Sequence, residues 1–346
     1  MTTIVPAGPP LEEPLFAIAR RSVLIHDSER DRWLGVDCWY PALDDSGAAS
    51  VYELLPGLGF TANARHETAA ETRSFPLVVW SHGRTGTRSA YVMLCEGLAA
   101  RGYIVVSSDH PGDTLGDWLL GAAVDDATNE AQRQADLRFV LDTATQSHAI
   151  IPAGARIDHT RIAVAGHSYG AHTVLSLCGD ENFDSRIKAV AGMQSLTRSI
   201  RRSAIARISV PLLMVVGMQD ATTPPELDAD RVFSAAGPLA RRVDIEAAGH
   251  QACSDVGLYL ELAPQVPELP DFIGDFVRSM ADNITGTAGD PWRPTVGLHL
   301  ELLGNWLGEV LGVESTQARV EFARLVERPG VSLRLGRGMA PDTVQS

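Results

Sequence analysis

From residue 75 onward, short apolar strands and amphipathic helices alternate along the chain, and few folds accommodate that rhythm. We predict strands at Pro76–Trp80, Tyr103–Ser107, Arg161–Ala165, Ile187–Met193, Val210–Met218 and Arg242–Ala247. We predict helices at Ser89–Arg101, across Leu137–Ala144 and at Ala171–Cys178. Such alternation is typical of an α/β protein with a mostly parallel central sheet flanked by helices on both faces. Ligand sites in these sheets lie at the carboxyl ends of the strands.

The remaining segments are assigned by their relation to that sheet. Arg21–His26 and Trp33–Tyr40 are predicted to form an antiparallel opening pair that Pro41 ends. A chain of 346 residues with 45% hydrophobic content can bury one large core. We therefore expect a single domain over residues 1–335, with a small flap at 112–126 and a proline-punctuated insertion at 264–294, followed by a helix near Leu298–Leu311. Residues 336–346 are expected to be a disordered tail.

Charge and composition exclude several classes of function. The net charge is −14 and the pI is near 5.1, so no basic surface is available for nucleic acid. No apolar run reaches the about 18 residues that a membrane span requires. Residues 1–10 lack the pattern of a signal peptide, so we expect a cytoplasmic protein. The four cysteines show no metal-binding spacing, and we expect neither a metal nor a cofactor.

A candidate nucleophile lies between a predicted strand and a predicted helix. Gly166-His-Ser-Tyr-Gly170 has the form G-x-S-x-G, in which Ser168 occupies a sharp strand-to-helix turn. Glycine at both ends, Gly166 and Gly170, is expected because larger side chains would block the turn. The helix that begins there directs its N–H groups and its positive dipole end toward developing negative charge.

A serine hydroxyl needs a base and an acid, which in this arrangement follow in the order Ser, Asp or Glu, His. Asp220 comes just past the apolar strand Val210–Met218, and His250 follows the strand that ends near Ala247. We predict Asp220 as the orienting acid and His250 as the general base. Asp228 and Asp230 are the alternative acids. His82 and His110 precede the nucleophile and are expected to be structural.

The developing oxyanion requires backbone N–H donors about 3 Å away. Tyr169, directly after the nucleophile, supplies one of them. The loop Ser81-His-Gly-Arg-Thr-Gly86, which follows the first strand of the alternating region, is expected to supply the other through the N–H of Arg84.

Several motifs together resemble a known family. They are Val36–Pro41 with Trp-Tyr-Pro, Trp80-Ser-His-Gly83, Leu98–Tyr103, Ser108–Thr114, Asp136–Asp142 and Gly166–Gly170. Over about residues 20–255, the chain resembles the predicted dienelactone hydrolases and their relatives, the platelet-activating-factor acetylhydrolases. The resemblance implies an α/β-hydrolase fold and metal-free serine hydrolysis of esters. It also implies Ser168, Asp220 and His250 as the triad, with Arg84 and Tyr169 as oxyanion donors. Dienelactone hydrolases proper use cysteine where Ser168 stands, which argues against dienelactone as the substrate.

The function expected from the sequence is hydrolysis of a small-molecule ester or lactone through an acyl-enzyme, without a cofactor. An acyltransferase, an amidase or a cyclising thioesterase would use the same triad. A non-catalytic binding protein on a hydrolase scaffold is the alternative from a different class. No pattern in the sequence specifies an oligomeric state.

Overall fold

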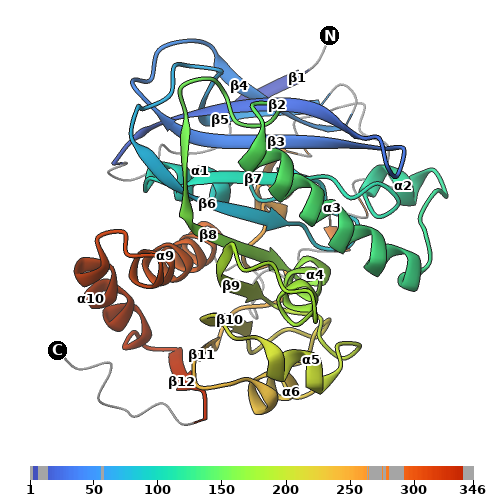
Figure 1. Ribbon diagram of the computed structural model, residues 1–346, viewed down its shortest axis with the longest axis vertical. Coiled ribbons are helices and arrows are strands. Elements are labelled where there is room, and N and C mark those ends of the chain that lie inside the picture. The colour runs from blue at the N-terminus through green and yellow to red at the C-terminus, as the bar shows by residue number, and fades with distance from the viewer. Residues whose placement is uncertain are drawn as a thin grey trace. The chain divides into compact units, whose positions relative to one another are not determined.

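The computed structural model of the protein describes residues 3–6, 15–55, 58–262, 264, 275, 278–279 and 292–337 (Figure 1). Two compact units are found, each with strands and helices of its own. The first is built from Met1–His159 and Ser254–Ala281, and the second from Thr160–Cys253 and Asp282–Ser346.

The first unit contains a mixed sheet in the strand order β1-β5-β2-β3-β7-β6, with β4 paired to β5. Its strands are β1 (Thr3–Pro6), β2 (Ala17–Asp27), β3 (Arg32–Ala42), β4 (Ala49–Leu55), β5 (Leu58–His66), β6 (Ser74–Ser81) and β7 (Ile104–Ser108). The predicted antiparallel opening pair is confirmed as β2 and β3, in which His26 lies opposite Trp33. Pro41 does not end β3 as predicted, because it lies near the strand end, where proline is tolerated.

Four helices are described in the first unit: α1 (Val92–Ala100), α2 (Leu115–Leu119), α3 (Asp126–Gln146) and α7 (Val256–Leu262). The face of α3 predicted to be buried is buried from Leu137 to Ala144. α1 begins three residues later than predicted, at Val92, where the buried Asp255 carboxylate accepts hydrogen bonds from the first N–H groups. The segment predicted as a flap, 112–126, contains α2, none of whose residues is buried.

The strands of the second unit are hydrogen-bonded in the order β8-β9-β10-β11-β12. Its strands are β8 (Arg156–His167, which enters the unit at Thr160), β9 (Ile187–Met193), β10 (Leu212–Gly217), β11 (Ala240–Ile245) and β12 (Val331–Leu335). β8 to β11 are parallel, and β12 runs antiparallel to β11. Every residue of β10 is buried, which explains its continuous apolar sequence.

The helices described in the second unit are α4 (Tyr169–Cys178), α5 (Arg202–Arg207), α6 (Ala229–Ala235), α9 (Trp292–Val310) and α10 (Ser315–Val326). α4 packs on β9, and α9 contacts both β9 and β10. The predicted last helix corresponds to α9 but begins at Trp292, earlier than expected and inside the predicted insertion.

Two of the predicted segments lie largely outside the part of the chain that the structure describes. Most of the insertion at 264–294, and residues 338–346 of the predicted tail, lie outside the described residues. Among the residues that are described, no helix combines the length and apolar character needed to cross a bilayer.

Candidate active site

Ser168 lies on a tight turn between β8 and α4. Its backbone angles, φ of 54° and ψ of −117°, lie in a region that residues other than glycine rarely adopt. The turn is held because the N–H of Ser168 donates to the Met193 carbonyl at 2.9 Å, while the Leu196 N–H donates to the Ser168 carbonyl at 3.2 Å. At Gly166, a Cβ atom would lie 2.5 Å from the carbonyl carbon of Gly170. Only glycine fits at position 166, and its lack of a side chain lets the end of β8 pass close to the first turn of α4.

His250 and Asp220 reach Ser168 from the loops that follow β11 and β10. His250 Nε2 is 2.9 Å from Ser168 Oγ, and His250 Nδ1 is 2.8 Å from Asp220 Oδ2. All three residues belong to the second unit and are largely buried. The structure therefore brings together the predicted nucleophile, base and acid in one hydrogen-bonded chain.

The Asp220 carboxylate accepts hydrogen bonds on both oxygens. Oδ1 accepts from the backbone N–H groups of Thr222 and Thr223, each at 2.8 Å. Oδ2 accepts from Thr223 Oγ1 at 2.6 Å and from His250 Nδ1. Burial by itself raises the pKa of Asp220, but the hydrogen bonds from His250 and Thr223 outweigh it, and the pKa is lowered. Asp220 is therefore ionised at neutral pH, and it fixes the tautomer in which His250 Nδ1 carries a proton.

The alternative acids lie elsewhere in the second unit. Asp228 accepts hydrogen bonds from the N–H groups of Thr197 and Arg198, and Asp230 pairs with Arg242. Neither carboxylate has a recorded bond to His250, so the geometry favours Asp220.

His167, the residue directly before Ser168, is hydrogen-bonded to the backbone of His250. Its Nε2 donates to the His250 carbonyl at 2.7 Å, and the two rings lie 4.8 Å apart. Burial, reinforced by the neighbouring His250, lowers the pKa of His167 to about 3, so its ring is neutral. Neither His167 nor Thr223 is singled out by the sequence pattern. The available signals are a polar residue at the first variable position of the motif and a threonine three residues after the acid, where Asx turns often form.

The loops carrying acid and base are also bonded directly to each other. The N–H of Gln219 donates to the Ala248 carbonyl at 3.0 Å. A Cβ at Gly217 would lie 2.5 Å from that same carbonyl oxygen, so the absence of a side chain permits this approach. The spacing of Asp220 and His250 is thus set by backbone contacts in addition to their side-chain bond.

The two predicted oxyanion donors lie in different parts of the chain. Tyr169 is the first residue of α4, so its backbone N–H lies at the positive end of the helix dipole. Arg84 lies in the first unit, in the loop between β6 and α1. Its side chain pairs with Asp126 at 2.5 Å and lies 3.8 Å from Asp113, which ties this loop to the segment at 112–126.

The peptide that carries the Arg84 N–H is held by a buried histidine. The His110 N–H donates to His82 Nε2 at 3.2 Å, so His82 Nδ1 is the donor to the Gly83 carbonyl, at 2.7 Å. Because a trans peptide directs its C=O and N–H oppositely, fixing the Gly83 carbonyl also fixes the Arg84 N–H. Burial, together with Arg133 and His110, lowers the pKa of His82 well below its usual range and keeps it neutral. His82 and His110 are thus both fully buried within the first unit.

The arrangement around Ser168 has a defined chemical capacity. A hydroxyl that donates to a neutral imidazole, itself oriented by a carboxylate, can lose its proton as it attacks an electrophilic carbon. The positive end of α4 begins at the next residue and stabilises negative charge there.

Comparison with known structures identifies the fold. The chain matches a ferulic acid esterase from Streptomyces cinnamoneus with a TM-score of 0.69 and 21% sequence identity, over 95% of this chain and 99% of that one. The protein has the α/β-hydrolase fold, as the sequence resemblance implied.

Sequence comparison gives a narrower similarity. Residues 57–135 match the family model described as platelet-activating factor acetylhydrolase, isoform II. A probable 1-alkyl-2-acetylglycerophosphocholine esterase from Arthroderma benhamiae is 27% identical over 113 residues, which are 32% of this chain. That match covers 29% of the relative's own length. The resemblance to α/β-hydrolase esterases is thus confirmed, over a shorter stretch of sequence than the motifs indicated.

Proposed function

We propose that this protein is a serine hydrolase that cleaves carboxylic esters through an acyl-enzyme intermediate. The observation that carries the proposal is the hydrogen-bonded chain from Ser168 Oγ through His250 to the Asp220 carboxylate. The names of the similar proteins, which are esterases, support the same class of reaction.

In the first half-reaction Ser168 Oγ attacks the acyl carbon while His250 Nε2 accepts its proton. The Asp220 carboxylate stays ionised and stabilises the imidazolium that forms. The carbonyl oxygen gains negative charge, and the backbone N–H groups of Tyr169 and Arg84 are the proposed donors to it. His250 then gives its proton to the leaving alcohol oxygen, and the acyl group remains on Ser168.

In the second half-reaction water replaces the alcohol. His250 removes a proton from the water as its oxygen attacks the acyl carbon, and the proton returns to Ser168 Oγ when the carboxylic acid leaves. The substrate is expected to be a small ester or lactone. No step requires a metal or an organic cofactor.

Burst kinetics with p-nitrophenyl acetate and butyrate test the proposal. An acyl-enzyme mechanism predicts rapid release of p-nitrophenol followed by slower steady turnover, whereas Ser168→Ala should show neither. Adding an alcohol and then analysing the products separates hydrolysis from acyl transfer. A folded wild-type protein that releases no p-nitrophenol from either ester would overturn the proposal.

A further inference from the structure

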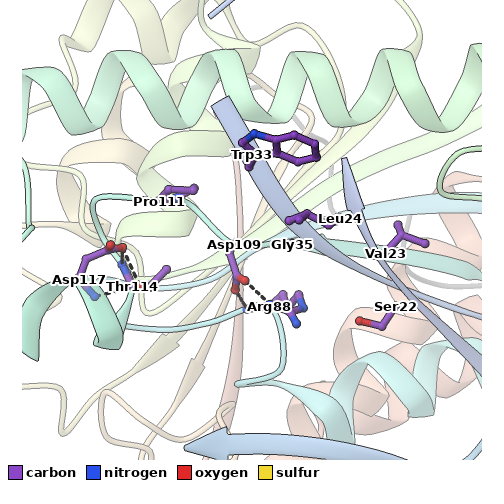
Figure 2. Close-up of a pocket in the computed structure, with 10 residues that line it drawn as sticks. All are labelled: Ser22, Val23, Leu24, Trp33, Gly35, Arg88, Asp109, Pro111, Thr114 and Asp117. Carbon is purple, nitrogen blue, oxygen red and sulfur yellow. Dashed lines mark hydrogen bonds and ion pairs between the residues drawn. The ribbon is translucent and has the colours of Figure 1, made fainter. Parts of the chain in front are cut away.

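The first unit contains a pocket that involves none of the proposed catalytic residues. Its volume is about 480 Å³, a size typical of sites for small molecules. Figure 2 shows Trp33 and Leu24 on one side of the pocket, and Thr114 and Asp117 on the other. Arg88 and Asp109 lie between these two sides.

Trp33 forms an exposed aromatic wall whose orientation is fixed. It is 53% exposed, and the neighbouring Leu24 is 63% exposed, although both are large apolar side chains. The His26 ring stacks on Trp33 with centroids 4.3 Å apart and planes inclined by 17°, and Asp31 holds that imidazole at 3.0 Å. A preordered ring loses little conformational entropy when a ligand packs against it.

Arg88 and Asp109 form a rigid polar floor. The N–H of Arg88 donates to Asp109 Oδ1 at 2.7 Å, and Arg88 Nη1 bonds to Asp109 Oδ2. Arg88 Nε also lies 3.4 Å from the buried Asp37. The pair lies directly over Gly35 of β3, where a Cβ would be 2.6 Å from Arg88 Nη1 and 2.8 Å from Asp109 Oδ2. Glycine at this position therefore makes room for the floor.

Asp117 presents a fixed carboxylate from the opposite side. Its Oδ2 accepts from the N–H groups of Gly112 and Thr114 at 2.7 and 3.0 Å, and from Thr114 Oγ1 at 2.6 Å. Every hydrogen bond that the described residues donate to this carboxylate goes to Oδ2, so Oδ1 remains as a further acceptor on a residue that lines the pocket. The side chain is thus held without using its second oxygen.

The charges of the lining exclude several ligand classes. Arg88 is already paired with Asp109 and Asp37, and Asp117 adds negative charge, so an anion would be repelled. Trp33 is the one aromatic side chain on the described lining, whereas cages for quaternary ammonium groups use several. No group of three or more potential metal ligands is found among the described residues. A neutral ligand with one apolar face and several hydroxyl groups meets the remaining requirements.

We propose that this pocket binds a neutral saccharide, with the C–H face of a sugar ring stacked on Trp33 and its hydroxyl groups hydrogen-bonded to Arg88, Asp109 and Asp117. The negative face of the indole attracts the aligned C–H groups. Paired charged groups supply donors and acceptors side by side, and hydrogen bonds to charged groups are stronger than neutral ones.

Calorimetric titration and saturation-transfer NMR with methyl glucoside, galactoside and xyloside test the proposal. The full-length protein should bind at least one of them saturably, with glycerol as a control that has hydroxyl groups but no ring face. Trp33→Ala should weaken binding by about tenfold or more, because the stacking surface is lost. Trp118→Ala is the matched control, because Trp118 is also 53% exposed but does not line the pocket. Leu24→Ala truncates an exposed wall residue and should weaken binding without altering thermal unfolding.

Ser168→Ala should bind the glycosides as the wild type does, because Ser168 lies outside this pocket. This variant separates failure of the saccharide proposal from failure of the proposed hydrolase. The saccharide proposal is wrong if the folded wild type binds no glycoside, or if Trp33→Ala and Trp118→Ala bind equally. Saturable binding of tetramethylammonium in place of every glycoside would also contradict it.

Discussion

Replacing Thr223 by valine removes one hydroxyl from the support of Asp220 while keeping the side-chain shape. The bond lost from Asp220, at 2.6 Å, is the shortest to that carboxylate, and the hydroxyl's longer contacts with the Gln194 carbonyl, at 3.1 Å, and with His250 Nδ1, at 3.3 Å, are lost with it. A buried hydrogen bond to a charged group contributes about 1.5–3 kcal/mol, so Thr223→Val should lower the free energy of unfolding by about that amount. Asp220 keeps both backbone N–H bonds to Oδ1 and the bond from His250.

The effect on catalysis should be smaller than the effect on stability. Asp220 is ionised both before and during the attack, so the Thr223 bond is present in the ground state and in the transition state. Only the loss of orientation slows the reaction, and kcat should fall by less than about tenfold, with KM little changed.

Urea unfolding and steady-state ester hydrolysis measure the two effects. Thr222→Val is the matched control, because the Thr222 side chain is exposed and only its backbone N–H bonds to Asp220. Equal losses of stability in the two variants, or a loss below about 0.5 kcal/mol in Thr223→Val, would refute the reasoning about this bond.

Three further outcomes are expected. Gly166→Ala places a Cβ 2.5 Å from the carbonyl carbon of Gly170, so urea unfolding should show marked destabilisation and Ser168 should become unreactive; a stable, active variant contradicts this. His82→Ala removes the imidazole donor from the Gly83 carbonyl and leaves it only the Gly86 N–H, at 3.0 Å. This variant should lower kcat about tenfold or more at unchanged KM, whereas unchanged turnover would remove the proposed support of the Arg84 N–H. The pKa of His167 falls from 6.5 to about 3 on folding, so the free energy of unfolding decreases on acidification between those pH values, by up to about 1.4 kcal/mol per pH unit. In urea unfolding, His167→Gln should reduce this dependence of the unfolding free energy on pH.

The sequence predicts most of the second unit's sheet because its strands are buried on both faces. Continuous apolar residues in β10 identify the strand, and the next polar residue with a carboxylate, Asp220, then falls at its carboxyl end. The same logic places His250 after β11 and Ser168 after β8. Each of these positions follows from the apolar runs that mark buried strands and from the order of the elements along the chain, and both can be read from the sequence.

Other features depend on contacts between distant residues. β4 and β5 lack long apolar runs, so their pairing is not apparent before the fold is known. Thr223 and His167 gain their roles only when three loops meet at His250. The Arg88–Asp109 floor requires Gly35 to lie beneath it, and this depends on the loops after β6 and β7 meeting over β3. Local sequence patterns do not indicate such contacts between distant segments.

Intact-mass analysis after treatment with a fluorophosphonate tests the central claim most directly, because only an activated serine reacts. The wild type should gain one probe mass, with the label located on Ser168 by peptide mapping. Ser168→Ala, confirmed as folded by circular dichroism, should gain none. A single label on another residue, or no label on the folded wild type, would contradict the assignment of Ser168 as the nucleophile.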